Sequence, residues 1–138
     1  MNRFLRALPA PAKGQSPLYP ISLALCLLAS PAQASEQFGL IFVYRIDCAA
    51  SRAFSTSLKT VTDHYRMTVL PVSLDEHRFT EWPGTVRDRG QAQALGIDRV
   101  PFLALFDQTT GALAPITSRY LPPARLEQRI AATLETLP

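Results

Sequence analysis

Cysteine is almost absent from this sequence, which holds only Cys26 and Cys48 in 138 residues. The two are far apart, so they form neither a disulfide-rich framework nor the C-x-x-C pair of dithiol redox enzymes. Histidine is equally scarce, with His64 and His77 alone. Because no H-x-x-x-H or C-x-x-C spacing exists, we predict no metal site and no bound cofactor.

A hydrophobic run long enough for a comfortable membrane span is also missing. The longest apolar stretch, Leu18 to Ala29, is short for that purpose. Basic residues precede it without any acid, and the A-x-A pattern Ala32-Gln33-Ala34 follows it. This arrangement is typical of an export signal. We predict a signal peptide over residues 1–34, a mature chain that begins at Ser35, and membrane contact only through an uncleaved signal.

The excess of positive charge belongs to that signal. Arg3, Arg6 and Lys13 account for 3 of the 14 basic residues, so 11 remain in residues 35–138 against 11 acidic residues. No basic run follows residue 34, which argues against nucleic acid or anionic membrane as a partner. We therefore expect a protein partner. The remaining 104 residues, 138 less 34, suffice for one small domain.

Removal of the signal takes Cys26 away, so Cys48 is the single thiol of an exported domain. It follows the apolar run Ile41 to Tyr44 and precedes a helical pattern. A thiol at a helix N-terminus faces unpaired backbone N–H groups and the positive end of the helix dipole, both of which favour thiolate. The nearby Arg45 and Arg52 act in the same direction, whereas Asp47 opposes ionisation.

Hydrophobic periodicity predicts the order βαβαββα. Residues 40–44 form a central strand covered on both faces, and residues 50–65 an amphipathic helix. Pro71 within the strand 67–74 favours a sheet edge, with that position facing solvent. A short helix near 87–95, strands 102–106 and 113–116, and a helix over 122–134 follow. We predict an α/β domain over residues 35–138: a minimal thioredoxin-like fold, with a four-stranded mixed sheet and helices on both faces.

Arg99-Val100-Pro101 immediately precedes the predicted strand 102–106. Thioredoxin-like folds place a cis-proline there, facing the cysteine, and the preceding residue's backbone pairs with an extended substrate. By that resemblance Val100 and Pro101 form a substrate-binding ledge, and strand addition supplies affinity with little sequence selectivity. The alternative is an ordinary trans proline that starts a strand. Trp82, beside Pro83-Gly84, is either a protein-docking aromatic or part of the core.

Several motifs together resemble the thioredoxin-like pilin-assembly proteins of F-type conjugation systems, the TraF and TrbB group. They are Phe42-Val43-Tyr44-Arg45 with Cys48, Val72-Ser73-Leu74-Asp75, Gly90-Gln91-Ala92 with Leu95-Gly96-Ile97, Val100-Pro101, and the hairpin Asp107 to Gly111. The resemblance covers most of residues 38–135. It implies a periplasmic protein of donor bacteria that assists conjugative pilus assembly, with thiol-disulfide isomerase or oxidoreductase activity in members that keep a C-x-x-C pair.

This sequence departs from that pair, because Ser51 stands where the second cysteine would be. A mixed disulfide on Cys48 therefore has no neighbouring thiol to release it. We first predict a protein that assists pilus or type IV secretion assembly by binding periplasmic partners at a degenerate C-x-x-S site. The alternative is a monothiol isomerase with Cys48 as nucleophile and Ser51 as the donor that stabilises its thiolate. Two further readings stay open: an inert, partly buried Cys48, and an exported thioredoxin-like domain unrelated to conjugation.

Overall fold

The structure is a computed structural model that describes residues 37–137. The predicted signal peptide, residues 1–34, and its junction with Ser35 lie outside the described residues. Within residues 37–137 no helix has the length and hydrophobicity needed to cross a membrane.

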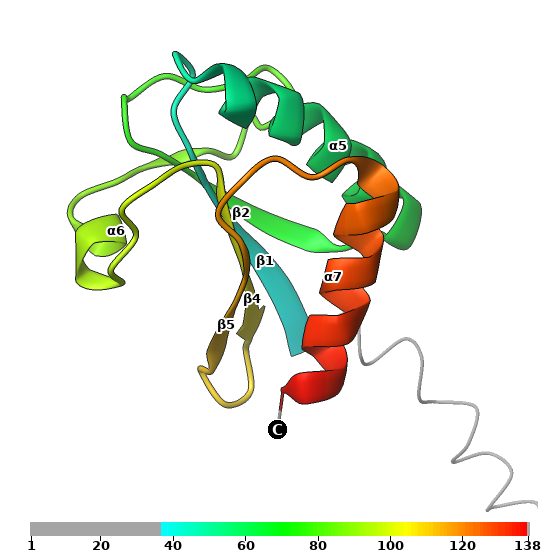
Figure 1. Cartoon of the computed structure of the whole chain (residues 1–138). Coiled ribbons are helices and arrows are strands. Elements are labelled where there is room, and N and C mark those ends of the chain that lie inside the picture. Colours follow the sequence, from blue (N-terminus) through cyan, green and yellow to red (C-terminus); the bar gives the residue numbers. More distant parts are fainter. Residues whose placement is uncertain (1–36, 138) are drawn as a thin grey trace, which may run out of the picture. The chain divides into compact units, whose positions relative to one another are not determined.

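Eight elements follow one another along the described chain (Figure 1). They are β1 (Phe38–Tyr44), α5 (Ala49–Tyr65), β2 (Thr68–Ser73), β3 (Val86–Arg87), α6 (Gln91–Ala94), β4 (Phe102–Asp107), β5 (Leu113–Thr117) and α7 (Pro123–Thr136). The predicted order βαβαββα is confirmed, apart from the additional strand β3.

The strands form one mixed sheet in the order β3-β2-β1-β4-β5. Strand β1 is central, as its apolar sequence predicted. It pairs in parallel with β2, where Val43 lies opposite Val72, and antiparallel with β4, where Val43 lies opposite Phe102. The predicted count of four strands is wrong by one. A strand of two exposed residues is too short to produce a readable alternation pattern.

Helices α5 and α7 pack side by side on one face of the sheet and bury the main core (Figure 1). Phe54, Leu58 and Val61 recur on one side of α5, and all three are fully buried. Trp82 also belongs to this core, with only 6% of its surface exposed. The reading of Trp82 as a docking aromatic is therefore wrong.

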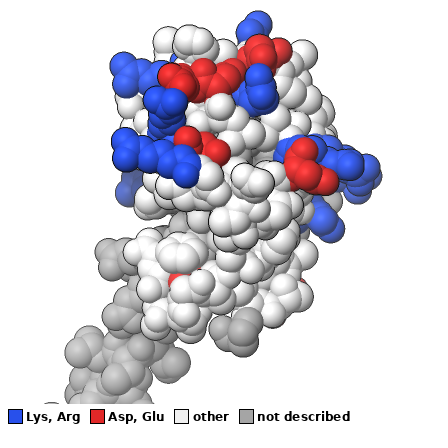
Figure 2. Space-filling view, turned by 90° about the vertical axis from the view of Figure 1, so that its left-hand side faces the viewer, with Lys and Arg blue, Asp and Glu red and all other residues white. Residues whose placement is uncertain are grey.

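Within residues 37–137, the opposite face carries only the short helix α6 and a small cluster of Val43, Val72 and Ala92. A shallow apolar groove lies beside it, along the first residues of β1 and β2. Figure 2 shows this side of the molecule, where charged side chains gather in the upper part and few occur below. Helices thus lie on both faces, as predicted, but their coverage is very unequal.

Two local predictions need correction. The helix expected near residues 87–95 is confined to Gln91–Ala94, because Arg87 pairs with Ser73 as part of β3. The strand that contains Pro71, β2, is not the predicted sheet edge, because β3 lies outside it, and Pro71 is buried rather than solvent-facing. Strand β3 pairs only with Val72 and Ser73. On the side of β2 that faces β3, Pro71 therefore needs no backbone hydrogen-bond partner.

The topology brings three loops to one end of the sheet. The parallel strands β1 and β2 both end there, and the antiparallel β4 begins there. Cys48 follows β1, Asp75 follows β2, and Pro101 precedes β4. Residues that are distant in the sequence therefore meet at this edge.

Candidate functional site

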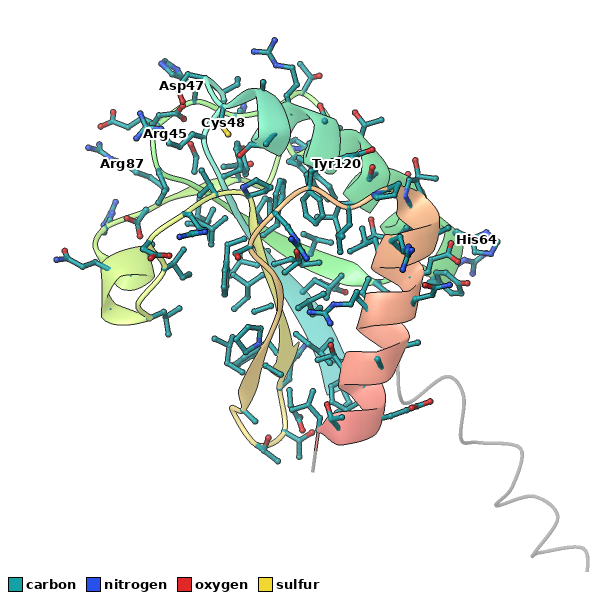
Figure 3. All side chains as sticks on the ribbon, in the orientation of Figure 1. Arg45, Asp47, Cys48, His64, Arg87 and Tyr120 are labelled. Atoms are coloured by element: carbon teal, nitrogen blue, oxygen red, sulfur yellow. The ribbon has the colours of Figure 1, made fainter. Side chains whose placement is uncertain are left out.

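Cys48 occupies the position immediately before the first turn of α5. Its backbone is extended, with φ −92° and ψ 117°, and its carbonyl accepts the first helical hydrogen bond from the Arg52 N–H at 3.1 Å. The thiol is free and partly exposed. Figure 3 shows it at the upper end of the molecule, at the opposite end of α5 from His64. The predicted placement of a thiol at a helix N-terminus is confirmed.

The pKa of the Cys48 thiol lies below its ordinary value. The strongest cause is the Ser51 hydroxyl, and the backbone N–H groups of Ser51 and Ala50 add to it. Partial burial and the Asp47 carboxylate act in the opposite direction without cancelling the shift. The site therefore favours thiolate through donors on the first turn of the helix.

Ser51 is completely buried, and its hydroxyl is a buried side-chain polar group without a hydrogen-bond partner among the described residues. No aligned hydrogen bond joins it to the neutral thiol. A buried donor without an acceptor is unfavourable. Ionisation of Cys48 would supply an acceptor beside this hydroxyl, which explains why Ser51 has the largest influence on the pKa of the thiol.

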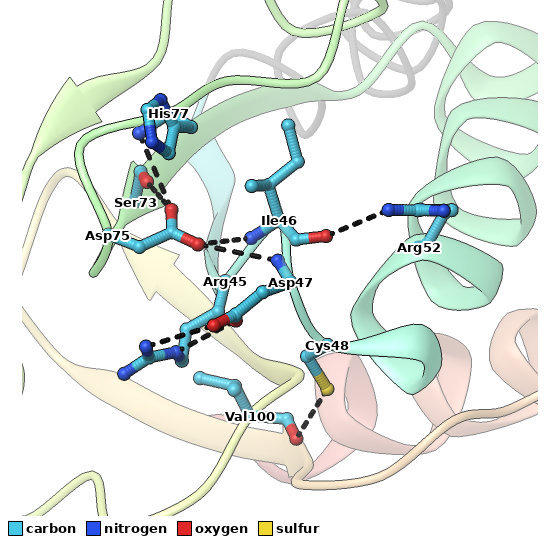
Figure 4. A network of polar contacts seen from close by, with 9 residues as sticks. All are labelled: Arg45, Ile46, Asp47, Cys48, Arg52, Ser73, Asp75, His77 and Val100. Atoms are coloured by element: carbon cyan, nitrogen blue, oxygen red, sulfur yellow. Dashed lines mark hydrogen bonds and ion pairs between the residues drawn. The ribbon is translucent and has the colours of Figure 1, made fainter.

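The two arginines that the sequence suggested as thiolate partners are engaged elsewhere (Figure 4). Arg45 donates two hydrogen bonds to the Asp47 carboxylate, at 3.0 and 3.2 Å. Arg52 donates to the Ile46 carbonyl at 3.2 Å. The Ser51 hydroxyl lowers the pKa of Cys48 together with the helix N-terminus, one of the groups expected to favour thiolate, and the two arginines are not among the principal influences.

The Val100-Pro101 peptide bond is cis, as the sequence reading favoured. Pro101 is buried and Val100 half-buried. The Val100 carbonyl oxygen lies 4.0 Å from the Cys48 sulfur, within reach of a weak S–H···O contact (Figure 4). No backbone–backbone hydrogen bond of Val100 occurs within residues 37–137. The structure thus brings together Cys48, Ser51, Val100 and Pro101, which were singled out from the sequence.

Asp75 is a site residue that sequence reasoning missed. Its carboxylate accepts hydrogen bonds from the Ile46 N–H at 2.7 Å, the Asp47 N–H at 3.4 Å and the Ser73 hydroxyl at 2.9 Å (Figure 4). It therefore fixes the turn that carries Cys48. A usable signal was present, because an acid directly after a strand parallel to β1 must lie beside the residues that follow β1.

Burial disfavours the charged form of Asp75, but its hydrogen bonds more than compensate. The Ser73 hydroxyl and the backbone N–H groups of Ile46, Asp47 and His77 together hold the pKa of this carboxyl below its ordinary value. Asp75 is thus ionised at neutral pH and serves as an acceptor for the turn.

Residues 37–137 contain no group of three or more His, Cys, Asp or Glu side chains placed to hold a metal ion. The chemistry available at the site is that of one activated thiol beside unpaired backbone groups. Such a thiolate can attack a disulfide sulfur. Ser51 cannot reverse that step, because release of a mixed disulfide requires attack by a thiolate and Ser51 has only a hydroxyl.

Comparison with known proteins identifies the family of this chain. The family model described as TraF, F plasmid transfer operon protein, matches residues 30–131. The chain belongs to the TraF family. Protein TraF of Escherichia coli strain K12 is 29% identical over 90 residues, which cover 65% of this chain and 36% of that protein. The match thus spans only about a third of the length of the curated relative.

Solved structures confirm that this TraF-family chain has a thioredoxin-like fold. The thioredoxin domain of a thiol-disulfide oxidoreductase from Bacteroides vulgatus has a TM-score of 0.53 at 15% identity, covering 75% of this chain and 84% of that one. A DsbF homologue from Corynebacterium diphtheriae has a TM-score of 0.53 at 16% identity, covering 73% and 74%. Thioredoxin-2 of the malaria parasite has a TM-score of 0.52 at 12% identity, covering 70% and 82%.

Proposed function

We propose that this TraF-family chain is an exported, periplasmic protein that assists assembly of a conjugative pilus or its secretion apparatus. Membership of the F plasmid transfer family supports the conjugation context. The export pattern in residues 1–34 supports the location. The protein acts by binding extended segments of other exported proteins at the edge formed by Cys48, Val100 and Pro101.

The unpaired backbone of Val100 is the observation that carries this proposal. Its N–H and carbonyl have no backbone partner within the described residues, and it borders the thiol. An extended client segment can pair with these groups as an added strand. The client residue that lies there then faces Cys48. Because no second thiol follows Cys48, binding rather than net oxidation or reduction is the main activity.

Complementation of conjugation tests the proposal. Donor cells that lack the gene receive the wild-type gene, Cys48→Ala or Val100→Pro, and plasmid transfer is counted. We expect Cys48→Ala to retain transfer within about threefold, whereas Val100→Pro, which removes a backbone N–H, lowers it at least tenfold. Thermal unfolding and immunoblots check that each variant is folded and abundant. Loss of transfer with a folded, abundant Cys48→Ala protein would refute binding as the main activity.

The location has its own test. The protein is released from donor cells by osmotic shock, and its mass and N-terminal sequence are determined. We expect a periplasmic chain that starts at Ser35. A chain that stays in the cytoplasm with its first 34 residues intact contradicts the proposed location.

A second candidate function is monothiol disulfide isomerisation, which the lowered pKa of Cys48 favours. The Cys48 thiolate attacks a client disulfide, forms a mixed disulfide and releases one client thiolate. Another client thiolate then attacks the mixed disulfide on the client sulfur. This step frees the Cys48 thiolate and leaves a rearranged client disulfide, with no net oxidation.

Mixed disulfides provide the test of isomerisation. Periplasmic extracts are alkylated in acid and separated on non-reducing gels, with Cys48→Ala as the control. Isomerisation predicts adducts that contain this protein, disappear on reduction and are missing in Cys48→Ala. Their absence from wild-type donor cells during pilus assembly would argue strongly against this candidate.

A further inference from the structure

Three arginines gather where β5 passes into α7. Arg119 lies in the connecting loop, and Arg125 and Arg129 lie on α7; all three are exposed. They line two adjoining hollows of about 420 and 310 Å³, and both hollows include Arg119, Arg129 and Thr117. The Arg129 guanidinium also donates to the Ile116 carbonyl at 3.0 Å, which holds it at the end of β5. We call these three side chains the arginine cluster.

None of the cluster forms an ion pair with a carboxylate in residues 37–137. Three other arginines, Arg45, Arg87 and Arg99, do have acidic partners. Residues 35–138 carry equal numbers of acidic and basic side chains, 11 of each. The cluster is therefore a local concentration of positive charge on a chain that is neutral without its predicted signal.

Local electrostatics oppose this arrangement. Arg125 lies in the first turn of α7, where the helix dipole is positive and no acidic side chain is present. Arg125 and Arg129 are four residues apart, so they repel each other on the same side of the helix. Natural sequences tolerate such conflicts mainly at functional sites. A bound anion would relieve both repulsions.

The cluster adjoins the Val100 ledge. Arg99 and Phe102, which flank Val100 and Pro101, line the larger hollow together with Arg119. Leu103 pairs with Thr117, and the Thr117 hydroxyl accepts from the Arg119 N–H at 3.2 Å and donates to the Arg119 carbonyl at 3.0 Å, which holds Arg119 beside the end of β5. In the sheet, β4 lies between β5 and β1, and β1 is the strand that leads to Cys48. Figure 3 shows Tyr120, the residue after Arg119, in the same upper half of the molecule as Cys48.

We propose that the arginine cluster binds acidic side chains of the client segment that pairs with Val100. This inference rests on the proposed binding function and specifies its partner chemistry. Arginine forms paired, charge-assisted hydrogen bonds with carboxylates. An extended segment advances about 3.3 Å per residue, so client residues a few positions from the one facing Cys48 extend along the surface beside Val100, where Arg99 and Phe102 line the larger hollow. Arg99 and Phe102, the residues on either side of Val100 and Pro101, line the larger hollow, and this proximity favours a peptide over a free anion or a membrane surface.

A peptide-tethering experiment on the full mature chain tests the inference. Two nine-residue peptides carry one central cysteine and either two glutamates or two glutamines on each side of it. Each is supplied as a disulfide with 2-mercaptoethanol. The Cys48 thiolate attacks the peptide sulfur, forms the mixed disulfide and releases 2-mercaptoethanol as its thiolate. Mass spectrometry at equilibrium measures how strongly Cys48 retains each peptide.

We expect Cys48 to retain the glutamate peptide about tenfold more than the glutamine peptide at low salt. Arg119→Gln and Arg125→Gln should each reduce this preference about threefold, the size expected for exposed ion pairs. Sodium chloride at about 1 M should nearly abolish it, because salt screens exposed charges. Arg89→Gln is the matched control, since Arg89 is exposed in the loop before α6, and it should leave the preference unchanged.

The two proposals fail in different ways. Equal retention of both peptides, or a preference that Arg119→Gln and Arg125→Gln leave intact, overturns the role of the cluster. If Cys48 retains the glutamine peptide no more strongly than 2-mercaptoethanol, the proposed pairing of a client segment with Val100 is wrong. Phosphatidylglycerol vesicles supply the membrane alternative. Vesicle binding that depends on Arg119 and Arg125, without discrimination between the peptides, would assign the cluster to lipid and overturn the inference.

Discussion

At the scale of single residues, two neighbours determine the reactivity of Cys48. Ser51 and the first backbone N–H groups of α5 stabilise its thiolate, whereas Asp75 holds the turn before it. The first effect acts on the charge of the sulfur and the second on its position. Substitutions at Ser51 and Asp75 can therefore separate these two contributions.

Alkylation by iodoacetamide as a function of pH tests the first effect. The rate should reach half its maximum clearly below the ordinary thiol pKa of about 8.5, because the folded protein favours thiolate. Ser51→Ala removes the strongest stabilising group, so its midpoint should move upward toward that value. Ser57→Ala, another buried serine of α5, should leave the midpoint unchanged. A wild-type midpoint at the ordinary value, or no shift in Ser51→Ala, would contradict this assignment.

Asp75→Asn tests the second effect. An amide offers one acceptor oxygen instead of two and cannot accept at its nitrogen, so part of the turn network is lost. We expect the free energy of unfolding to fall by about 1 to 2 kcal/mol. The alkylation rate of Cys48 should also change, because the turn that holds its thiol in position is altered.

Thermal and urea unfolding of the purified variant provide the measurement. Asp63→Asn is the control, because Asp63 pairs only with Lys59 on the surface and such pairs contribute little. If Asp75→Asn and Asp63→Asn lower the free energy of unfolding equally, Asp75 does not position the turn.

At the scale of elements, the end of α5 shows how a backbone requirement can conflict with the residue present. Arg66 terminates the helix in a left-handed conformation, with φ 54° and ψ 41°, and its N–H donates to the Thr62 carbonyl. Glycine adopts this conformation without steric penalty, whereas a side chain at Cβ is disfavoured there. The backbone conformation that ends the helix is therefore one that the arginine side chain at this position disfavours.

Arg66→Gly should accordingly raise the free energy of unfolding by about 0.5 to 1 kcal/mol, after allowance for the larger unfolded-state entropy of glycine. Urea unfolding measures it. Arg66→Ala serves as the comparison, because alanine removes the charge and keeps Cβ, and it should give no gain. A glycine variant no more stable than the alanine variant would show that the left-handed residue is not a source of instability.

Most elements could be predicted from the sequence because their hydrophobic periodicity reports burial on one face. The pattern placed β1, α5, β4, β5 and α7 within one or two residues of their observed bounds. It failed for β3, whose two exposed residues pair only because the chain returns beside β2. It failed also for Pro71, since burial there depends on contacts from distant segments.

At the scale of the whole molecule, two carboxylates link stability to pH. Asp107 is fully buried, where burial raises its pKa, yet the Thr109 and Thr110 N–H groups and other donors lower it on balance. Asp75 behaves in the same way. Both have pKa values lower in the folded than in the unfolded chain, so the unfolded chain binds protons more tightly.

The contribution of these two carboxylates to the free energy of unfolding should therefore be constant above about pH 5 and fall as pH drops through the unfolded-state value of about 3.9. The loss should continue until the folded-state pKa values are passed. Urea unfolding between pH 7 and pH 2.5 measures this. The double variant Asp75→Asn with Asp107→Asn should be less stable at pH 7 and lose less on acidification. An equally steep loss in the double variant would assign acid sensitivity to other groups.

The sequence by itself determined the order of the elements and the position of Cys48 at a helix start, because local patterns of apolar residues specify both. It also identified the missing second thiol, which excludes self-release of a mixed disulfide. Only the tertiary structure decided that Asp75 holds the Cys48 turn, that Arg45 and Arg52 bind other groups, and that Arg119 and Arg129 line one hollow with Arg99 and Phe102. These relations join residues far apart in the chain, and hydrogen bonds and charge interactions depend on distances that only the folded chain defines.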